Sequence, residues 1–413
     1  MPRKLRGKSH ESQSDPNLVK YIDVCRKKDQ STSLQIINSL LIRGNALELN
    51  HSVDADKQLK IICKSFKVCH DIVKIDFSSS NLSRSIEDLS KLLKSHQQFT
   101  EIKLSNCHLT DKDSEPLFSG LSMNESLQIL DLSRNQFTDQ CSIAFVEFLQ
   151  NSLALRELNA SNLLIGKVFS NNFSKINNFA SLQELKLINC IGLNDHYPEL
   201  LKSLLIKCKS LKRLCINDCY IGHTQFSREF GLYAKKSQLK EIYLRNNNIG
   251  SEWALEFFSL AIASLDLRVI DFTSNGAIMN KGCISILKEI IQSENITLEV
   301  IYLHNIHVEH EFEELLDKIR FKHGNLTCFW GRESEHFSRN NLNFGFESLK
   351  SLLENHKLFF YHEYYFASYP ELRNLVGYGL KFPKLLPDGK TPSKTVPRVP
   401  AVRVASIMLS DEC

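Results

Sequence analysis

The sequence predicts an α/β fold in which one unit is stacked many times. Such a solenoid has a curved parallel β-sheet on its concave side and helices on its convex side. Three observations lead to this prediction. The pattern apolar-x-x-apolar-x-apolar-x-x-(Asn or Cys)-x-apolar recurs nine times, with another residue at the Asn or Cys position in three copies (Ser80, Leu163 and Ile306). Successive copies begin 27 to 31 residues apart, and a near-constant period indicates a repeated supersecondary unit. Each copy joins a short alternating run to a segment with helical periodicity.

The positions of the nine copies determine where strands and helices are predicted. The clearest copies cover residues 127–137 and 239–249, with alternating runs such as 129–132 and helical runs such as 143–149 and 284–291. We therefore expect about nine to ten repeats of strand, loop, helix and return. The copies begin at Ile72, Phe99, Leu127, Leu155, Leu182, Leu211, Leu239, Leu267 and Leu298.

The ends of the chain should protect the solenoid, because a terminal repeat would otherwise expose its core. Helices are predicted over about residues 16–28 and 33–43. The expected domains are a disordered basic tail (1–15), an N-terminal helical cap with a degenerate repeat (16–71), the solenoid (72–325), an aromatic-rich C-terminal cap (326–380) and a proline-rich, basic, extended tail (381–413).

The repeated pattern resembles the leucine-rich repeat. A helix in every unit of about 28 residues is similar to the ribonuclease-inhibitor-like class of these repeats. The resemblance covers roughly residues 45–330. It implies the fold described above and a surface that is displayed for binding.

Composition and charge narrow the class of protein. The chain is 42% hydrophobic and 24% charged, as in soluble folded proteins. We expect no membrane span, since the apolar runs are too short, and no secretory signal, since residues 1–8 are basic without an apolar segment behind them. A cytoplasmic location and reduced cysteines are expected. The net charge of +4 is concentrated in residues 1–8 and 381–403, which argues against a nucleic-acid partner.

The sequence offers little support for catalysis. It has no nucleotide-binding glycine loop and no zinc-protease helix. His304, His307 and His310 are a candidate metal site, but a spacing of three in extended chain splays the side chains, so surface histidines are preferred. Cys215 should face the concave surface and Cys219 the interior, without a base placed beside Cys215. We expect no catalytic residue, no cofactor and no metal.

Two positions in each strand should point to the concave face. In the later repeats these positions carry tyrosine and arginine, which are enriched where interfaces have most of their binding energy. Tyr243 and Tyr302 should lie roughly 10 Å apart. The alternative is that these are ordinary exposed strand residues. The predicted partner-binding residues are Arg213, Tyr243, Arg245, Asp271, Tyr302 and His304.

The function predicted from these features is a non-enzymatic scaffold that binds a protein partner. Residues 21–25, 102–109, 267–275 and 286–291 resemble centrosomal and ciliary leucine-rich-repeat proteins. That resemblance implies a cytoskeletal or axonemal assembly. One alternative is a GTPase activator similar to the Ran activator, although that family has an acidic C-terminal segment where this tail is basic. The sequence also leaves open a substrate adaptor of a ubiquitin ligase and, by fold analogy, a nuclease inhibitor.

Overall fold

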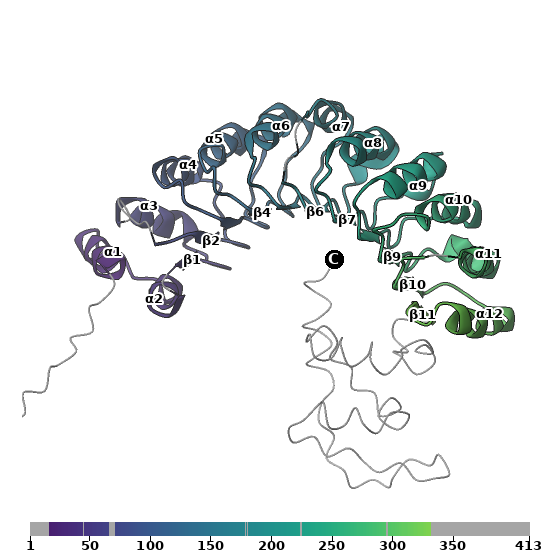
Figure 1. Cartoon of the computed structure of the whole chain (residues 1–413). Helices are drawn as coiled ribbons and strands as arrows, with labels where there is room; N and C mark the ends of the chain where they lie inside the picture. The colour runs from purple at the N-terminus through teal and green to yellow at the C-terminus, as the bar shows by residue number, and fades with distance from the viewer. Residues whose placement is uncertain are drawn as a thin grey trace, which may run out of the picture. The chain divides into compact units, whose positions relative to one another are not determined.

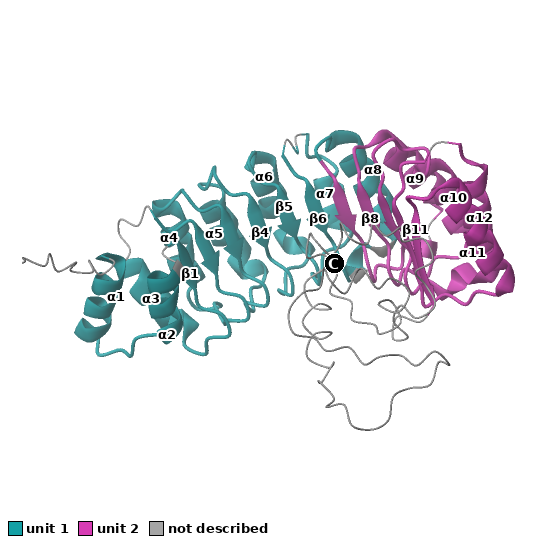
Figure 2. Ribbon diagram, turned by 60° about the horizontal axis from the view of Figure 1, so that its bottom comes forward, with its two compact units in different colours: residues 1–210 teal, residues 211–413 magenta. Residues whose placement is uncertain are grey.

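The computed structural model describes residues 16–331, except for residues 44, 66–70, 178, 180, 224 and 295. The chain divides into two compact units, with the boundary between Ser210 and Leu211 (Figure 2). The predicted tails (1–15 and 381–413) and most of the predicted C-terminal cap lie outside the described residues. The predicted domain boundaries therefore stay predictions.

The first unit alternates strands and helices along the chain. Its strands are parallel, and each pairs with the next strand in sequence order, as in the pairing of Ile75 with Ile102. Its elements are α1 (Pro16–Lys27), α2 (Leu34–Asn38), the π-helical turn η1 (Ser39–Arg43), β1 (Ala46–Glu48), α3 (Ala55–Ser65), β2 (Lys74–Asp76), α4 (Ile86–Ser95), β3 (Glu101–Lys103), α5 (Asp111–Leu121), β4 (Ile129–Asp131), η2 (Asp139–Cys141), α6 (Ser142–Asn151), β5 (Glu157–Asn159), α7 (Lys167–Phe173), β6 (Glu184–Lys186), η3 (Ile191–His196) and α8 (Tyr197–Lys207).

The second unit continues the same alternation. Its strands are also parallel and pair in chain order. Its elements are β7 (Arg213–Cys215), η4 (Ile221–His223), α9 (Ser227–Lys236), β8 (Glu241–Tyr243), α10 (Ser251–Ala261), β9 (Val269–Asp271), η5 (Gly276–Ile278), α11 (Met279–Gln292), β10 (Val300–His304), α12 (His310–Lys322) and β11 (Thr327–Gly331).

In each unit the helices cover one face of the sheet and leave the other open (Figure 1). The middle residue of each three-residue strand, such as Leu130 or Ile242, points toward the helices and is at most 2% exposed. Phenyl rings fill the space between sheet and helices. The ring of Phe145 lies 4.8 Å from that of Phe118 and 5.4 Å from that of Phe169, between centroids. This two-layer packing confirms the predicted α/β repeat fold.

The described strands include one for every predicted repeat and two more. β1 forms where the sequence predicts a degenerate repeat, and β11 forms at the start of the predicted C-terminal cap (326–380). The helix predicted over 33–43 differs from the structure, because α2 ends at Asn38 and a π-helical turn follows. The turn lies just before β1. Within it the side chains of Ser39 and Leu40 are buried, at 4% and 2% exposure.

Where a repeat carries Asn or Cys at this position of the pattern, the side chain hydrogen-bonds to backbone groups next to the strands. The Cys107 thiol donates to the carbonyl of Phe77 at 3.1 Å, and the Cys190 thiol donates to that of Ala160 at 3.2 Å. Burial raises the pKa of the Cys107 thiol to about 12, so it stays protonated and unreactive. The ten cysteines that the structure describes are free thiols.

Candidate partner-binding face

The six predicted partner-binding residues all lie on the open face of the second unit. Strand register places Cys215, Tyr243, Asp271, Tyr302 and Phe329 in one row across β7 to β11. Arg213 precedes this row in β7, while Arg245 and His304 come two residues after it in their strands. The alternation of side chains along a strand brings all six to the same face. We call this surface the tyrosine face, after Tyr243 and Tyr302.

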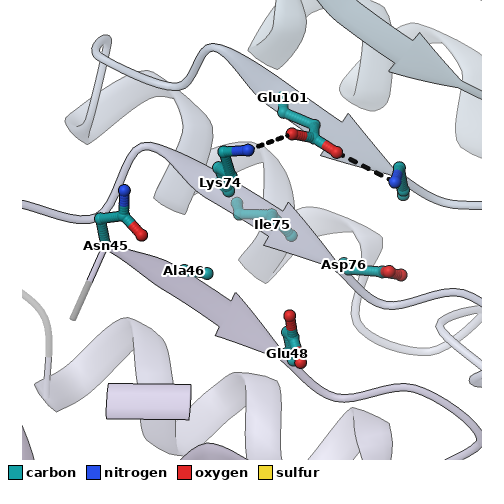
Figure 3. Close-up of a pocket in the computed structure, with 8 residues that line it drawn as sticks. Asn45, Ala46, Glu48, Lys74, Ile75, Asp76 and Glu101 are labelled. Atoms are coloured by element: carbon teal, nitrogen blue, oxygen red, sulfur yellow. Dashed lines mark ion pairs between the residues drawn. The ribbon is translucent and has the colours of Figure 1, made fainter. Parts of the chain in front are cut away.

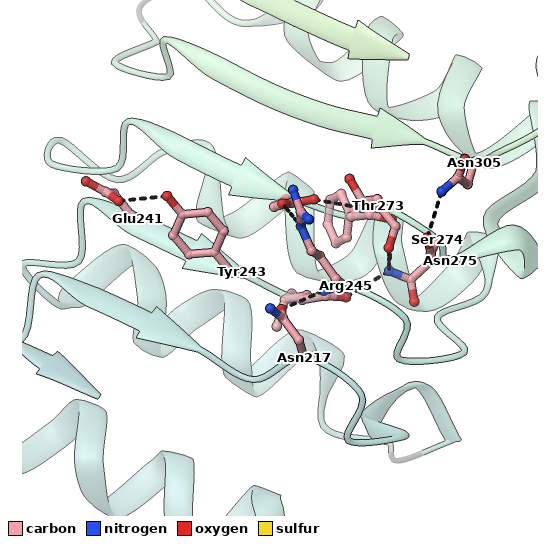
Figure 4. A network of polar contacts seen from close by, with 11 residues as sticks. Asn217, Glu241, Tyr243, Arg245, Thr273, Ser274, Asn275 and Asn305 are labelled. Carbon is pink, nitrogen blue, oxygen red and sulfur yellow. Dashed lines mark hydrogen bonds and ion pairs between the residues drawn. The ribbon is translucent and has the colours of Figure 1, made fainter. Parts of the chain in front are cut away.

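Glu241 joins Arg213 and Tyr243 into one contact chain, and Figure 4 shows its contact with Tyr243. Arg213 donates to both carboxylate oxygens of Glu241, from Nε at 2.7 Å and from Nη2 at 3.1 Å. The Tyr243 hydroxyl donates to Glu241 Oε2 at 2.8 Å. Glu241 therefore fixes both side chains and neutralises the guanidinium. Sequence reasoning missed Glu241, although its place two residues before Tyr243 and beside Arg213 in the next strand was a usable signal.

Asp271 is not displayed, which corrects the prediction that its side chain faces a partner. Its side chain is 0% exposed, and Arg245 Nε approaches its Oδ2 at 2.5 Å. Its other oxygen accepts from the backbone N–H of Thr273 at 2.8 Å. A carboxylate is buried in this way only when it is paired, and the guanidinium supplies the opposite charge. Arg245 itself keeps 29% of its side chain exposed.

An aromatic cluster occupies the end of the face at β10 and β11. The rings of Tyr302 and Phe329 are stacked, with centroids 4.9 Å apart and planes 12° apart. His304 lies 6.2 Å from Tyr302 and 6.1 Å from Phe329, between ring centroids. His304 is only 7% exposed, so the prediction that it is displayed is wrong. The reason is that the larger rings of Tyr302 and Phe329 lie next to it. Phe329 was missed, since residues 326–380 are predicted to form a C-terminal cap and no strand is expected there.

Cys215 also departs from the expected exposure. It lies in the open-face row but is 0% exposed. A thiol beside Tyr243 in the next strand reaches less far from the sheet and is covered. Of the six predicted residues, four keep accessible, half-buried side chains: Tyr243, Tyr302, Arg213 and Arg245.

The candidate metal-binding histidines are spread over different environments. His304 is buried among rings, His307 is exposed, and His310 lies at the start of α12, 3.9 Å from Glu313 and 3.7 Å from Glu314. Between residues 16 and 331, outside the gaps, no group of three or more His, Cys, Asp or Glu residues is placed to hold a metal ion.

The open face of the first unit has a different character. A hollow of about 340 Å³ lies over β1 to β3 (Figure 3). Glu101 pairs there with Lys74 at 2.8 Å and with Lys103 at 2.9 Å. Burial alone would raise the pKa of the Glu101 carboxyl, but the two lysines outweigh burial and hold that pKa below its ordinary value. None of the eight lining residues is aromatic, so the second unit offers the better binding anchors.

No helix in the described part of the chain combines the length and the apolar character needed to cross a membrane.

Comparison with known proteins supports the repeat assignment. Residues 124–140 match the family model described as leucine-rich repeat. NACHT, LRR and PYD domains-containing protein 5 of Mus musculus is 24% identical over 271 residues, and the match covers 62% of this chain. The chain spans only 22% of the length of that relative. Among solved structures, a chain of the yeast Rad7–Elc1 complex is similar, with a TM-score of 0.36 and 15% identity over 80% of this chain and 93% of that one.

The residues that match the family model include the copy at 127–137. The strand of this copy, and the loop and helix that follow it, recur through both units. Repeat proteins of this kind generally use an extended sheet face as a binding surface. The recurring geometry and the family match together make this chain a leucine-rich-repeat protein.

Proposed function

We propose that the chain is a non-enzymatic scaffold that binds a protein partner through the tyrosine face. One observation supports this most directly: Tyr243 and Tyr302 are half-buried rings held in place by their own neighbours. A fixed aromatic side chain loses little conformational entropy on binding. Exposed tyrosine and arginine on a rigid sheet are the residues that most often supply binding energy.

The six predicted residues divide into two roles in this proposal. Tyr243, Tyr302, Arg213 and Arg245 would contact the partner, because they remain accessible. Asp271 would act indirectly, since its buried carboxylate positions Arg245. His304 would likewise support the rings of Tyr302 and Phe329 from beneath.

The double variant Tyr243→Ala with Tyr302→Ala is expected to weaken partner binding by about 2 kcal/mol or more, which is roughly 30-fold in Kd. Both rings would be lost from the centre of the proposed interface. Partners are first captured from native cells with the wild-type chain. The affinity of a purified partner for each variant is then measured by titration calorimetry.

The matched control is Tyr233→Ala, because Tyr233 is also half-buried but belongs to α9 on the helix side. It should leave the affinity unchanged. Thermal melts must show that all three proteins are folded. A partner that binds the double variant as tightly as the wild type would contradict the proposed surface.

The identity of the partner is a finer proposal. The resemblance to centrosomal and ciliary leucine-rich-repeat proteins supports a partner in a centrosomal, ciliary or other cytoskeletal assembly of the cytoplasm. Imaging of the tagged chain beside a centrosomal marker tests this. A diffuse signal that ignores the marker would reject it and leave the GTPase-activator and ubiquitin-ligase-adaptor alternatives to be assayed in turn.

A further inference from the structure

The two tyrosines of the tyrosine face have a defined spacing. Tyr243 in β8 and Tyr302 in β10 are both register partners of Asp271 in β9. They are therefore two strand positions apart, which corresponds to about 9.6 Å across the sheet. Both rings are half-buried, and the pairs between them and beside them, Arg245 with Asp271 and Arg213 with Glu241, are internally neutral. The face therefore favours a ligand with apolar groups about 9.6 Å apart, and its own charges do not select the charge of that ligand.

A polyproline II segment has this spacing. It has three residues per turn and a rise of about 3.1 Å per residue, so prolines three positions apart lie on one side about 9.3 Å apart. Such segments bind aromatic surfaces because their conformation is already formed and little entropy is lost. Two prolines at this spacing, running across the strands, would place one ring on Tyr243 and the other on Tyr302.

The chain itself contains this ligand. Residues 381–413 hold five of its ten prolines, and Pro397-Arg-Val-Pro400 places two of them three residues apart. We propose that residues 396–401 dock on the tyrosine face of the same molecule, with Pro397 and Pro400 against the two tyrosine rings. This goes beyond the proposed function, since it gives the face an internal occupant that a partner must displace.

The length of chain beyond β11 permits this docking. β11 ends at Gly331, so 65 residues separate it from Pro397. A chain of 65 residues can reach much farther than the distance required, because β8 and β11 are only about 14 Å apart across the sheet. Covalent linkage to the same molecule can give an effective concentration near the millimolar range. A segment with an intrinsic Kd of about 0.1 mM would then cover the face about nine-tenths of the time.

Hydroxyl-radical footprinting of the full-length protein tests the proposal, with the labelling of each tyrosine read by mass spectrometry. In the variant Pro397→Ala with Pro400→Ala, Tyr243 and Tyr302 should be labelled up to about tenfold faster than in the wild type. Tyr233, on the helix side, serves as the internal reference and should not change. Equal labelling of Tyr243 and Tyr302 in the two proteins would overturn the proposal.

The matched control is Pro383→Ala with Pro387→Ala, whose prolines are four residues apart and do not share one side of a polyproline II helix. It should label like the wild type. A synthetic peptide of residues 394–404 should restore protection to the Pro397/Pro400 variant. The same peptide with one residue inserted between the prolines should not restore it. If both peptides act alike, the spacing argument is wrong.

Two further conditions separate this docking from charge attraction and from docking between two copies. Protection should persist in about 1 M salt, where charge attraction is screened within about 3 Å. Its loss there would assign the contact to the lysines and arginines of the tail, and it would overturn the proline-based proposal. Protection that rises with protein concentration would mean docking from a second copy, and it would overturn the intramolecular proposal.

The outcome is independent of the partner experiment. If the tyrosine double variant loses partner binding while the proline variants label like the wild type, the tail proposal fails and the proposed function stands. If the proline variants expose the tyrosines but the tyrosine double variant binds its partner normally, the reverse holds.

Discussion

Asn275→Ala is expected to lower the free energy of unfolding by about 4 kcal/mol. Asn275 is 0% exposed, and its side-chain amide links two repeats. It donates to the carbonyls of Leu244 at 2.8 Å and Phe272 at 2.9 Å. Its oxygen accepts from the backbone N–H groups of Asn247 at 2.8 Å and Ile249 at 3.0 Å. Alanine would leave these groups buried without their partner, at about 1–3 kcal/mol for each one that stays unsatisfied.

Urea unfolding followed by far-UV circular dichroism measures this loss. The control is Asn151→Ala, because Asn151 is exposed and makes one side-chain hydrogen bond, to the Glu147 carbonyl at 2.9 Å in α6. That change should alter the free energy of unfolding by less than about 0.5 kcal/mol. A loss below about 1 kcal/mol in Asn275→Ala would mean that water or a local shift satisfies the backbone groups.

Arg245→Ala should lower the free energy of unfolding by about 3 kcal/mol. Asp271 is fully buried in the wild type, and the substitution removes its charge partner. The Thr273 N–H at 2.8 Å is the remaining hydrogen-bond donor among the contacts described above. The cost comes mainly from this uncompensated buried charge. The same urea titration measures this loss of unfolding free energy. The loss should lie near the lower end of the range of about 3–5 kcal/mol for breaking a buried ion pair, because the Arg245 side chain is 29% exposed.

Two comparison variants make the Arg245 result specific. Arg213→Ala removes an ion pair whose side chains are 40% and 25% exposed, so it should cost less than about 1 kcal/mol. The double variant Arg245→Met with Asp271→Leu removes both charges and should recover most of the lost stability. If the double variant is as unstable as Arg245→Ala alone, packing of the arginine stem rather than charge explains the loss.

The sequence was sufficient to predict which residues share the tyrosine face, but it was insufficient to predict which of their side chains are exposed. Period-two alternation within strands and the constant repeat length put Tyr243, Asp271 and Tyr302 side by side, because both are backbone properties. Exposure depends instead on the direction in which long side chains extend over their neighbours. Arg245 folds across to the neighbouring strand and pairs with Asp271, and the rings of Tyr302 and Phe329 cover His304.

Two more differences between prediction and structure have causes of their own. Glu241 was missed because the enrichment of tyrosine and arginine at interfaces does not point to the acid that holds them. The π-helical turn after Asn38 arises where the chain passes from a cap helix into β1, and apolar periodicity does not distinguish it from an α-helix.

The register of β8, β9 and β10 also limits how this surface can change during evolution. One whole repeat, residues 267–297, separates the repeats that carry Tyr243 and Tyr302. Gain or loss of a complete repeat would alter the distance between the rings in steps of about 4.8 Å while preserving each local environment. Ligand length could therefore diverge among descendants of this gene by duplication or deletion of repeats, without redesign of either tyrosine site.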